Sequence, residues 1–286
     1  CGVGSPAEVV KRAKELGYPA VALTGHGVTY GLIELYEAGK KQGVKPILGC
    51  EFYCANRSRH DKEAKIDVKP YHLTVLAKNN QGYKNLLKLT TLAHLEGFYY
   101  KPRVDYELLE QYSEGLIVLS GCMAAHLPRL ILSENEEEVH KLIEKFIKIY
   151  GKENYFLEIQ HNLRMEEQKI VNARLKELAK QYDLGLVLTL DSHYPRPEDK
   201  EVHDILLCIQ TGSTVDQENR MRYEGDFSLR AIDEIKEFYK DTPEVIENTL
   251  KIAEMCNVDF QFDQNLIPAF QTPDNKTAKE YLRELC

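Results

Sequence analysis

Side chains of the types that bind metal ions follow short apolar runs at several places in this 286-residue sequence. The run from Leu186 to Leu190 is too short for a helix and is typical of a buried strand, and Asp191 and His193 come directly after it. Because alternate residues of a strand face the same way, this carboxylate and this imidazole should point in one direction. Barrels of the α/β class present catalytic or metal-binding groups at strand ends in this manner. Taken alone, the pair could equally be polar residues at the surface.

The same pattern recurs elsewhere in the chain. His26, Glu51 and Cys122 each lie at or just beyond the end of an apolar run, and His72 begins one. Singly, Cys122 could be a small buried hydrophobe and His72 a core imidazole bonded to a carbonyl group. Together with Asp191 and His193, these residues predict a centre where strand ends converge. Such ligands suit two or three Zn, Mn or Fe ions, which activate water and hold a phosphate ester.

Two basic residues, Lys101 and Arg103, lie in the loop after the third predicted strand. They are candidates for contacts with a substrate phosphate at the mouth of the site. Simple solvation is the alternative for loop residues of this kind.

Apolar runs and amphipathic segments alternate along the first two thirds of the chain. Ser5, Pro6 and Glu8 form a helix-start signal with a capping box. Strands are predicted at 20–23, 45–51, 72–77, 115–122, 155–160 and 185–190, with helices at 30–41, 80–93, 134–150 and 165–182 between them. This alternation predicts parallel strands joined by right-handed crossovers. After Tyr194, helices are predicted at 198–210, 231–239, 243–256 and 277–286.

Composition narrows the class of protein. The formal net charge is −8 and no basic stripe is visible, so a nucleic-acid partner would have to be gripped mainly by another part of the molecule. Seven scattered Cys residues favour reduced thiols, and the Cys50-x-x-x-Cys54 pair is a weak zinc signal without a second pair. No signal peptide or membrane-spanning run is visible, so we expect a cytoplasmic protein without membrane contacts.

Several motifs in order resemble the PHP (polymerase and histidinol phosphatase) domain, in the version at the N-terminus of bacterial replicative DNA polymerase III alpha subunits. The motifs are 24–27 (TGHG), 46–53 (PILGCEFY), 72–77 (HLTVLA), 97–103 (GFYYKPR), 120–122 (SGC) and 191–194 (DSHY). The resemblance implies a distorted (β/α)7 TIM-like barrel with up to three metals at its mouth. It also implies a nucleotidyltransferase, a DNA-directed DNA polymerase, whose catalytic domains would follow Cys286. In some members of the family the metal cluster performs 3′→5′ exonuclease proofreading, and in others the domain is only structural.

The sequence departs from the family pattern at its start. The His-x-His pair of the family's first strand has no counterpart here, an Asp ligand falls at or beside Cys1, and Gly25 stands where the family usually has Asp. We therefore expect a barrel incomplete at the N-terminus, incomplete metal binding and no activity of this fragment alone. Intein junctions would also explain Cys1 and Cys286, but arbitrary fragment ends explain them equally well.

The predicted organisation is a barrel at 1–210, a helical extension packing on it at 211–270, and a linker with the start of the polymerase region at 271–286. A stand-alone phosphoesterase such as histidinol phosphatase is an alternative function, although a helix beginning near Thr277 disfavours it. A catalytically inactive structural domain is a second alternative. If the chain is part of a polymerase, the expected partners are DNA, bound through the rest of the polymerase, and other replisome subunits.

Overall fold

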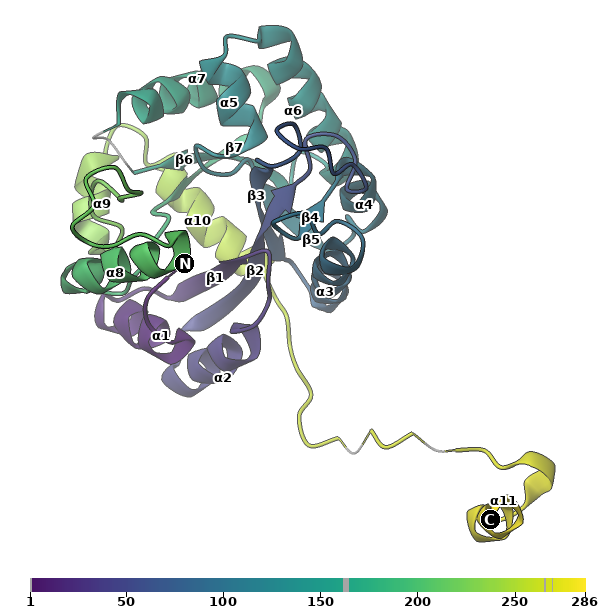
Figure 1. Cartoon of the computed structure of the whole chain (residues 1–286). Coiled ribbons are helices and arrows are strands. Elements are labelled where there is room, and N and C mark those ends of the chain that lie inside the picture. The colour runs from purple at the N-terminus through teal and green to yellow at the C-terminus, as the bar shows by residue number, and fades with distance from the viewer. Residues whose placement is uncertain (1, 162–164, 265, 269) are drawn as a thin grey trace.

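The computed structural model describes residues 2–161, 165–264, 266–268 and 270–286, and Figure 1 shows a curled sheet surrounded by helices. The strands are β1 (Ala20–His26), β2 (Lys45–Cys54), β3 (Tyr71–Ala77), β4 (Arg103–Val104), β5 (Leu116–Leu119), β6 (Tyr155–Gln160) and β7 (Gly185–Thr189). The helices are α1 (Pro6–Glu15), α2 (Leu32–Gln42), α3 (Asn80–Leu95), α4 (Tyr106–Gln111), α5 (His126–Leu132), α6 (Glu136–Tyr150), α7 (Glu166–Tyr182), α8 (Lys200–Thr211), α9 (Ile232–Phe238), α10 (Glu244–Met255) and α11 (Ala278–Leu285). The predicted α/β class with a barrel-like sheet and extra C-terminal helices is confirmed as a curled half-barrel.

Local sequence signals account for the first helix. The Ser5 side chain accepts a hydrogen bond from the backbone N–H of Glu8, and the Glu8 carboxylate accepts one from the backbone N–H of Ser5. Pro6 occupies the first turn, where its missing N–H costs nothing. The predicted capping box is confirmed.

Strand direction differs from the prediction at one place. The sheet order is β1-β2-β3-β5-β6-β7, and β3 runs antiparallel to both of its neighbours while the other strand pairs are parallel. The prediction of an all-parallel sheet is therefore wrong. The physical reason is the connection between β2 and β3, residues 55–70, which contains no helix to carry the chain back along the sheet. The start of β3 consequently lies at the same rim as the ends of β1 and β2.

Each face of the sheet packs against different helices. The outer face belongs to a large core that includes residues of α1, α2, α3, α6 and α7. On the inner face, Ile47, Leu76 and Phe156 pack with Ile252 and Ala253 of α10, which lies within the curl (Figure 1). Because side chains alternate along a strand, Glu51, Glu158 and His72 share this inner face with those apolar residues, closer to the rim. The inner face is thus apolar beside α10 and polar at the rim.

The sheet leaves space inside its curl. Among the described strands, β1 and β7 each have one neighbour, at opposite ends of the sheet order. A cavity of about 790 Å³ lies against both of these strands and against α10. The predicted division of the chain at residues 210 and 270 stays a prediction. Helix α11 lies apart from the sheet (Figure 1), and no helix among the described residues is long and apolar enough to cross a membrane.

Arg103 anchors the loop between β2 and β3. Its side chain is fully buried, and its guanidinium donates hydrogen bonds to the backbone carbonyls of Gly97, Asp67, Arg59 and Asp61 at 2.8–3.2 Å. A buried cation that satisfies several carbonyl groups fixes the course of the chain around it. The expectation that Arg103 contacts a substrate phosphate is therefore wrong, because its donors are used inside the protein.

Replacing Arg103 with Leu should destabilise the chain by about 3 kcal/mol or more, because buried carbonyl groups lose their donor. Urea unfolding followed by circular dichroism measures the change. The matched control is Arg222→Leu, at an exposed position, which should change the free energy of unfolding by less than about 0.5 kcal/mol. Equal, small effects of both substitutions would contradict the anchoring role.

Candidate metal centre

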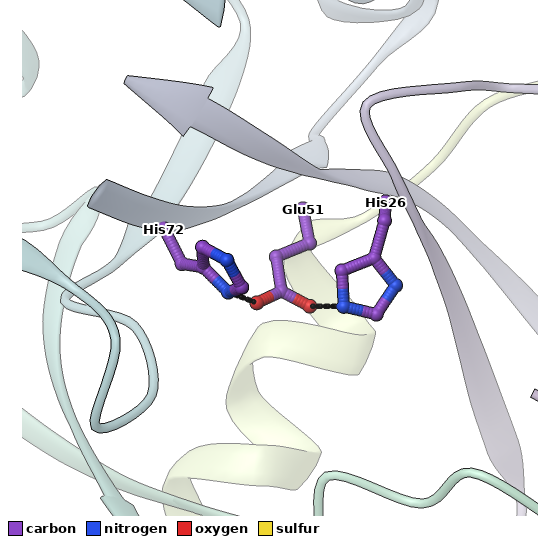
Figure 2. Close-up of side chains that lie close together, drawn as sticks. All are labelled: His26, Glu51 and His72. Atoms are coloured by element: carbon purple, nitrogen blue, oxygen red, sulfur yellow. Dashed lines mark hydrogen bonds and ion pairs between the residues drawn. The ribbon is translucent and has the colours of Figure 1, made fainter. Parts of the chain in front are cut away.

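Three predicted ligands meet at the rim of the sheet, as Figure 2 shows. His26 ends β1 and lies opposite Glu51 of β2 in parallel register, while His72 comes from the start of antiparallel β3. His26 Nε2 lies 3.2 Å from Glu51 Oε2, and His72 Nδ1 lies 2.6 Å from Glu51 Oε1. One ligand atom from each residue lies within 4.8 Å of the others. This group could hold a metal ion.

Cys122 joins this group from the loop that follows β5. Its Sγ lies 3.6 Å from Glu51 Oε1 and 3.4 Å from His72 Nδ1. Burial, together with the charges of Glu51 and Asp191, raises the pKa of the Cys122 thiol well above its usual range. Without a cation the sulfur is therefore a thiol, and a bound cation would favour the thiolate.

Asp191 and His193 lie beside the group, although not on a strand. Strand β7 ends at Thr189, and Asp191 has a left-handed backbone with a φ of 49°, so the expectation that strand alternation aligns the pair is wrong. Instead, His193 Nδ1 lies 2.6 Å from the backbone carbonyl oxygen of Asp191 and its ring centroid lies 6.0 Å from that of His26. The Nε2 atom of His193 is buried and has no hydrogen-bond partner within the described residues. An orphaned ring nitrogen, oriented by a carbonyl group on its other side, is what a metal ligand presents.

Burial sets the protonation of the imidazoles and of Asp191. It lowers the pKa of His26 to about 4 and also lowers that of His193, so both rings are neutral near pH 7. Burial and then the charge of Glu51 raise the pKa of Asp191 to about 7. Burial alone would raise the pKa of Glu51, but the hydrogen bond from His72, and then the attraction of His26 and His72 in their protonated forms, lower it. Neutral imidazoles beside an ionised carboxylate suit divalent cations.

Gly25 leaves His26 without an orienting partner. The Nδ1 atom of His26 forms no hydrogen bond to any residue that the structure describes. A side chain at position 25 would come within 3.2 Å of the carbonyl oxygen of Val28, and the Gly25 carbonyl oxygen itself accepts from Cys50 Sγ at 3.3 Å. Among the described residues, Glu51 is thus the one polar partner of the His26 ring.

Several other His and Cys residues are not proposed as metal ligands. His161 Nδ1 lies 3.2 Å from the Tyr239 hydroxyl and its ring packs on Phe238, away from the centre. Cys50 and Cys54 are buried free thiols, in line with the expectation of reduced cysteines. His203 is buried and packs its ring 5.3 Å from that of His193.

A carboxylate that sequence reasoning missed lies inside the same cavity. Glu158 of β6 is buried, accepts hydrogen bonds from the Thr189 hydroxyl and the Gly121 backbone N–H, and lines the cavity together with His26 and Glu51. Burial, and then the charges of Asp191 and Glu51, raise its pKa to about 7. The available signal was a charged residue within the otherwise apolar strand sequence YFLEIQ.

Two tyrosines, also missed, border the centre. Tyr53 of β2 packs its ring 6.2 Å from that of His26 and 5.2 Å from that of His72. Tyr223, in the segment between α8 and α9, packs 4.8 Å from the ring of His193. Burial and the negative groups of the centre raise the pKa of each to about 12, so both keep their hydroxyl protons.

The raised pKa of Glu158 predicts the pH dependence of stability in the metal-free chain. The folded state binds more protons than the unfolded state between pH 4.5 and about 7, so the free energy of unfolding should fall as pH rises through this window. Replacing Glu158 with Gln should remove on the order of 3 kcal/mol of this fall. Urea unfolding from pH 4.5 to 8.5 with a chelator present measures it. The same pH profile in wild type and Glu158→Gln would contradict the assignment.

Comparison with known proteins places the chain in one family. The PHP domain matches residues 1–162. DNA polymerase III subunit alpha of Treponema pallidum is 42% identical over 287 residues, which cover 99% of this chain and 24% of that protein. The Borreliella burgdorferi subunit is 41% identical, over 99% of this chain and 25% of that protein. The Thermus aquaticus subunit is also 41% identical, over 93% of this chain and 22% of that protein. The chain spans about a quarter of the length of the curated relatives it matches, and the matching part is their N-terminal region.

Proposed function

The chain belongs to the PHP domain family and is homologous to the N-terminal region of bacterial DNA polymerase III alpha subunits, and on this basis we propose that it holds divalent metal ions for 3′→5′ exonuclease proofreading. The observation that carries the proposal is the group of His26, Glu51 and His72, whose ligand atoms lie within 4.8 Å of one another. Cys122, Asp191 and His193 complete the proposed ligand set. The mixture of imidazole, carboxylate and thiol donors suits Zn, Mn or Fe ions.

The donor set fits a cation better than it fits a closed hydrogen-bond network. Three acidic groups, Glu51, Asp191 and Glu158, share one buried region, and the Nε2 atom of His193 has no partner within the described part of the chain. Such a region is costly without positive charge, because buried like charges repel and buried polar atoms need partners. A divalent ion would reduce the repulsion between the carboxylates and would also give the Nε2 atom of His193 a partner.

The residues of the chain have distinct roles in the proposed site. A divalent ion at such a centre polarises a phosphoryl group and lowers the pKa of a water molecule. Glu51 presents its two oxygens to opposite sides, toward His26 and His72, and can therefore serve two neighbouring positions. The Asp191 carbonyl group fixes the ring of His193 with Nε2 free. Glu158 holds a proton on its carboxyl group below pH 7 and so limits the negative charge behind the site.

Because the chain has a net charge of −8, most of the contacts with DNA phosphates would come from other parts of the polymerase. DNA would therefore reach the rim through the rest of the polymerase, in the cytoplasm and together with other replisome subunits. The chain by itself is proposed to bind metal incompletely and to be inactive as a nuclease.

A second candidate is a structural PHP domain without catalysis. The observation that favours it is Gly25, which leaves the Nδ1 atom of His26 without a hydrogen bond to any described residue. The two candidates differ in metal content, because a structural domain does not need a metal ion.

Replacing Glu51 with Gln should lower the affinity of the chain for zinc or manganese at least tenfold, because the central anionic ligand becomes a neutral amide. Metal binding is measured by equilibrium dialysis with elemental analysis of the protein. The control His60→Gln changes an exposed imidazole outside the group and should bind metal as the wild type does. A wild-type chain that binds neither metal, or a Glu51→Gln chain that binds as tightly, would overturn the proposed metal centre.

A further inference from the structure

Tyr53 is a buried residue whose hydroxyl has no partner in the described part of the chain. The residue is 9% exposed, and its hydroxyl forms no hydrogen bond to any described residue. A tyrosine hydroxyl that no protein group occupies is available to a ligand. Tyr53 and Glu51 are alternate residues of β2 and therefore face the same side, toward the metal centre.

Lys101 is held directly over the ring of Tyr53. Its Nζ lies 5.5 Å from the ring centroid, and it forms no ion pair with an acidic group in the described ranges. The backbone fixes its position: Tyr99 N–H donates to the Lys101 carbonyl at 3.0 Å across a tight turn, with Tyr100 in a left-handed conformation at its tip. Two residues further on, Arg103 pairs with Tyr53 in the sheet. The ammonium group is thus positioned by its own loop and is not neutralised.

Glycine at position 27 permits this arrangement. Gly27 has a φ of 66°, and a Cβ there would come 2.8 Å from the ring of Pro102 and 3.2 Å from that of Tyr53. The backbone after His26 can therefore approach both Tyr53 and the loop that carries Lys101.

Tyr223 approaches the centre from a separate element. The backbone N–H of His193 donates to the Phe227 carbonyl at 2.8 Å, and the Phe227 N–H donates to the Tyr194 hydroxyl at 2.9 Å, so this segment is fixed beside His193. The ring of Tyr223 packs on both His193 and Phe227. Its hydroxyl, like that of Tyr53, makes no hydrogen bond to another described residue.

The two tyrosine hydroxyls and the Lys101 ammonium group are hydrogen-bond donors at a rim that otherwise carries negative charge. An anionic phosphate that approaches Glu51 and Asp191 meets like charge, and Arg103, the other basic residue of the loop, is used inside the protein. We propose that the Tyr53 and Tyr223 hydroxyls and the Lys101 ammonium group bind the non-bridging oxygens of the substrate phosphate, as donors placed around the metal centre. This assignment rests on the proposed metal-dependent function. Neutral hydroxyl donors and one cation suit a phosphodiester, which carries a single negative charge.

The test uses inorganic phosphate as the probe. The chain is loaded with zinc, free zinc is removed, and the dissociation constant for phosphate is measured by isothermal titration calorimetry. Tyr53→Phe, Tyr223→Phe and Lys101→Met should each raise it about tenfold, because each removes one hydrogen bond to a charged group. Zinc content and the thermal unfolding midpoint should stay at the wild-type values, since none of the three residues is a proposed ligand.

Matched controls remove the same groups elsewhere. Tyr100→Phe removes an exposed hydroxyl at the tip of the turn, and Lys88→Met removes an exposed ammonium group on α3, and neither should change the dissociation constant. Wild-type phosphate affinity in the three test variants, at unchanged zinc content, would overturn the phosphate site and leave the metal centre standing. A wild-type chain that takes up no zinc would overturn the proposed function and this assignment with it.

Discussion

The Glu51 carboxylate, buried between two imidazoles, is the interaction on which the site depends. An ionised carboxylate in the interior is stable only when its oxygens are paired, and here His26 and His72 lie 3.2 and 2.6 Å from its two oxygens. The pairing requires three strand ends at one rim, and the antiparallel direction of β3 supplies the third. The polar rim and the apolar interior around α10 are two ends of the same inner face, so the packing of that helix also fixes where the cluster can lie.

Electrostatics connect the fold with metal binding. Glu51, Asp191, Glu158 and the Cys122 thiol line one cavity, and burial, together with the charges of neighbouring carboxylates, raises the pKa of Asp191 and of Glu158 to about 7. In the absence of a cation the protein reduces this repulsion by keeping protons. A divalent ion would replace those protons, so metal affinity should be linked to proton release.

Much of this arrangement could be predicted from the sequence, because strand ends and capping residues leave local signals. Ser5 and Glu8 identified the first helix, and the positions of His26, Glu51 and His72 against apolar runs indicated a common rim. The alternation of segments predicts a parallel β3, whereas the helix-free stretch at 55–70 and the histidine at the start of the strand fit its antiparallel direction. The burial of Arg103 and the position of Tyr223 depend on contacts between distant segments, which no local pattern encodes. Glu158 cannot be identified from the sequence alone, because a single charge in an apolar strand can also face solvent.

Anomalous diffraction from crystals of the chain soaked with zinc tests the central claim most directly, because it locates the ion independently of any activity. The account predicts a peak at the zinc edge among His26, Glu51 and His72, with ligand atoms at about 2.0–2.2 Å. A peak near Cys50 and Cys54 alone, or no peak at the rim at saturating zinc, would contradict it.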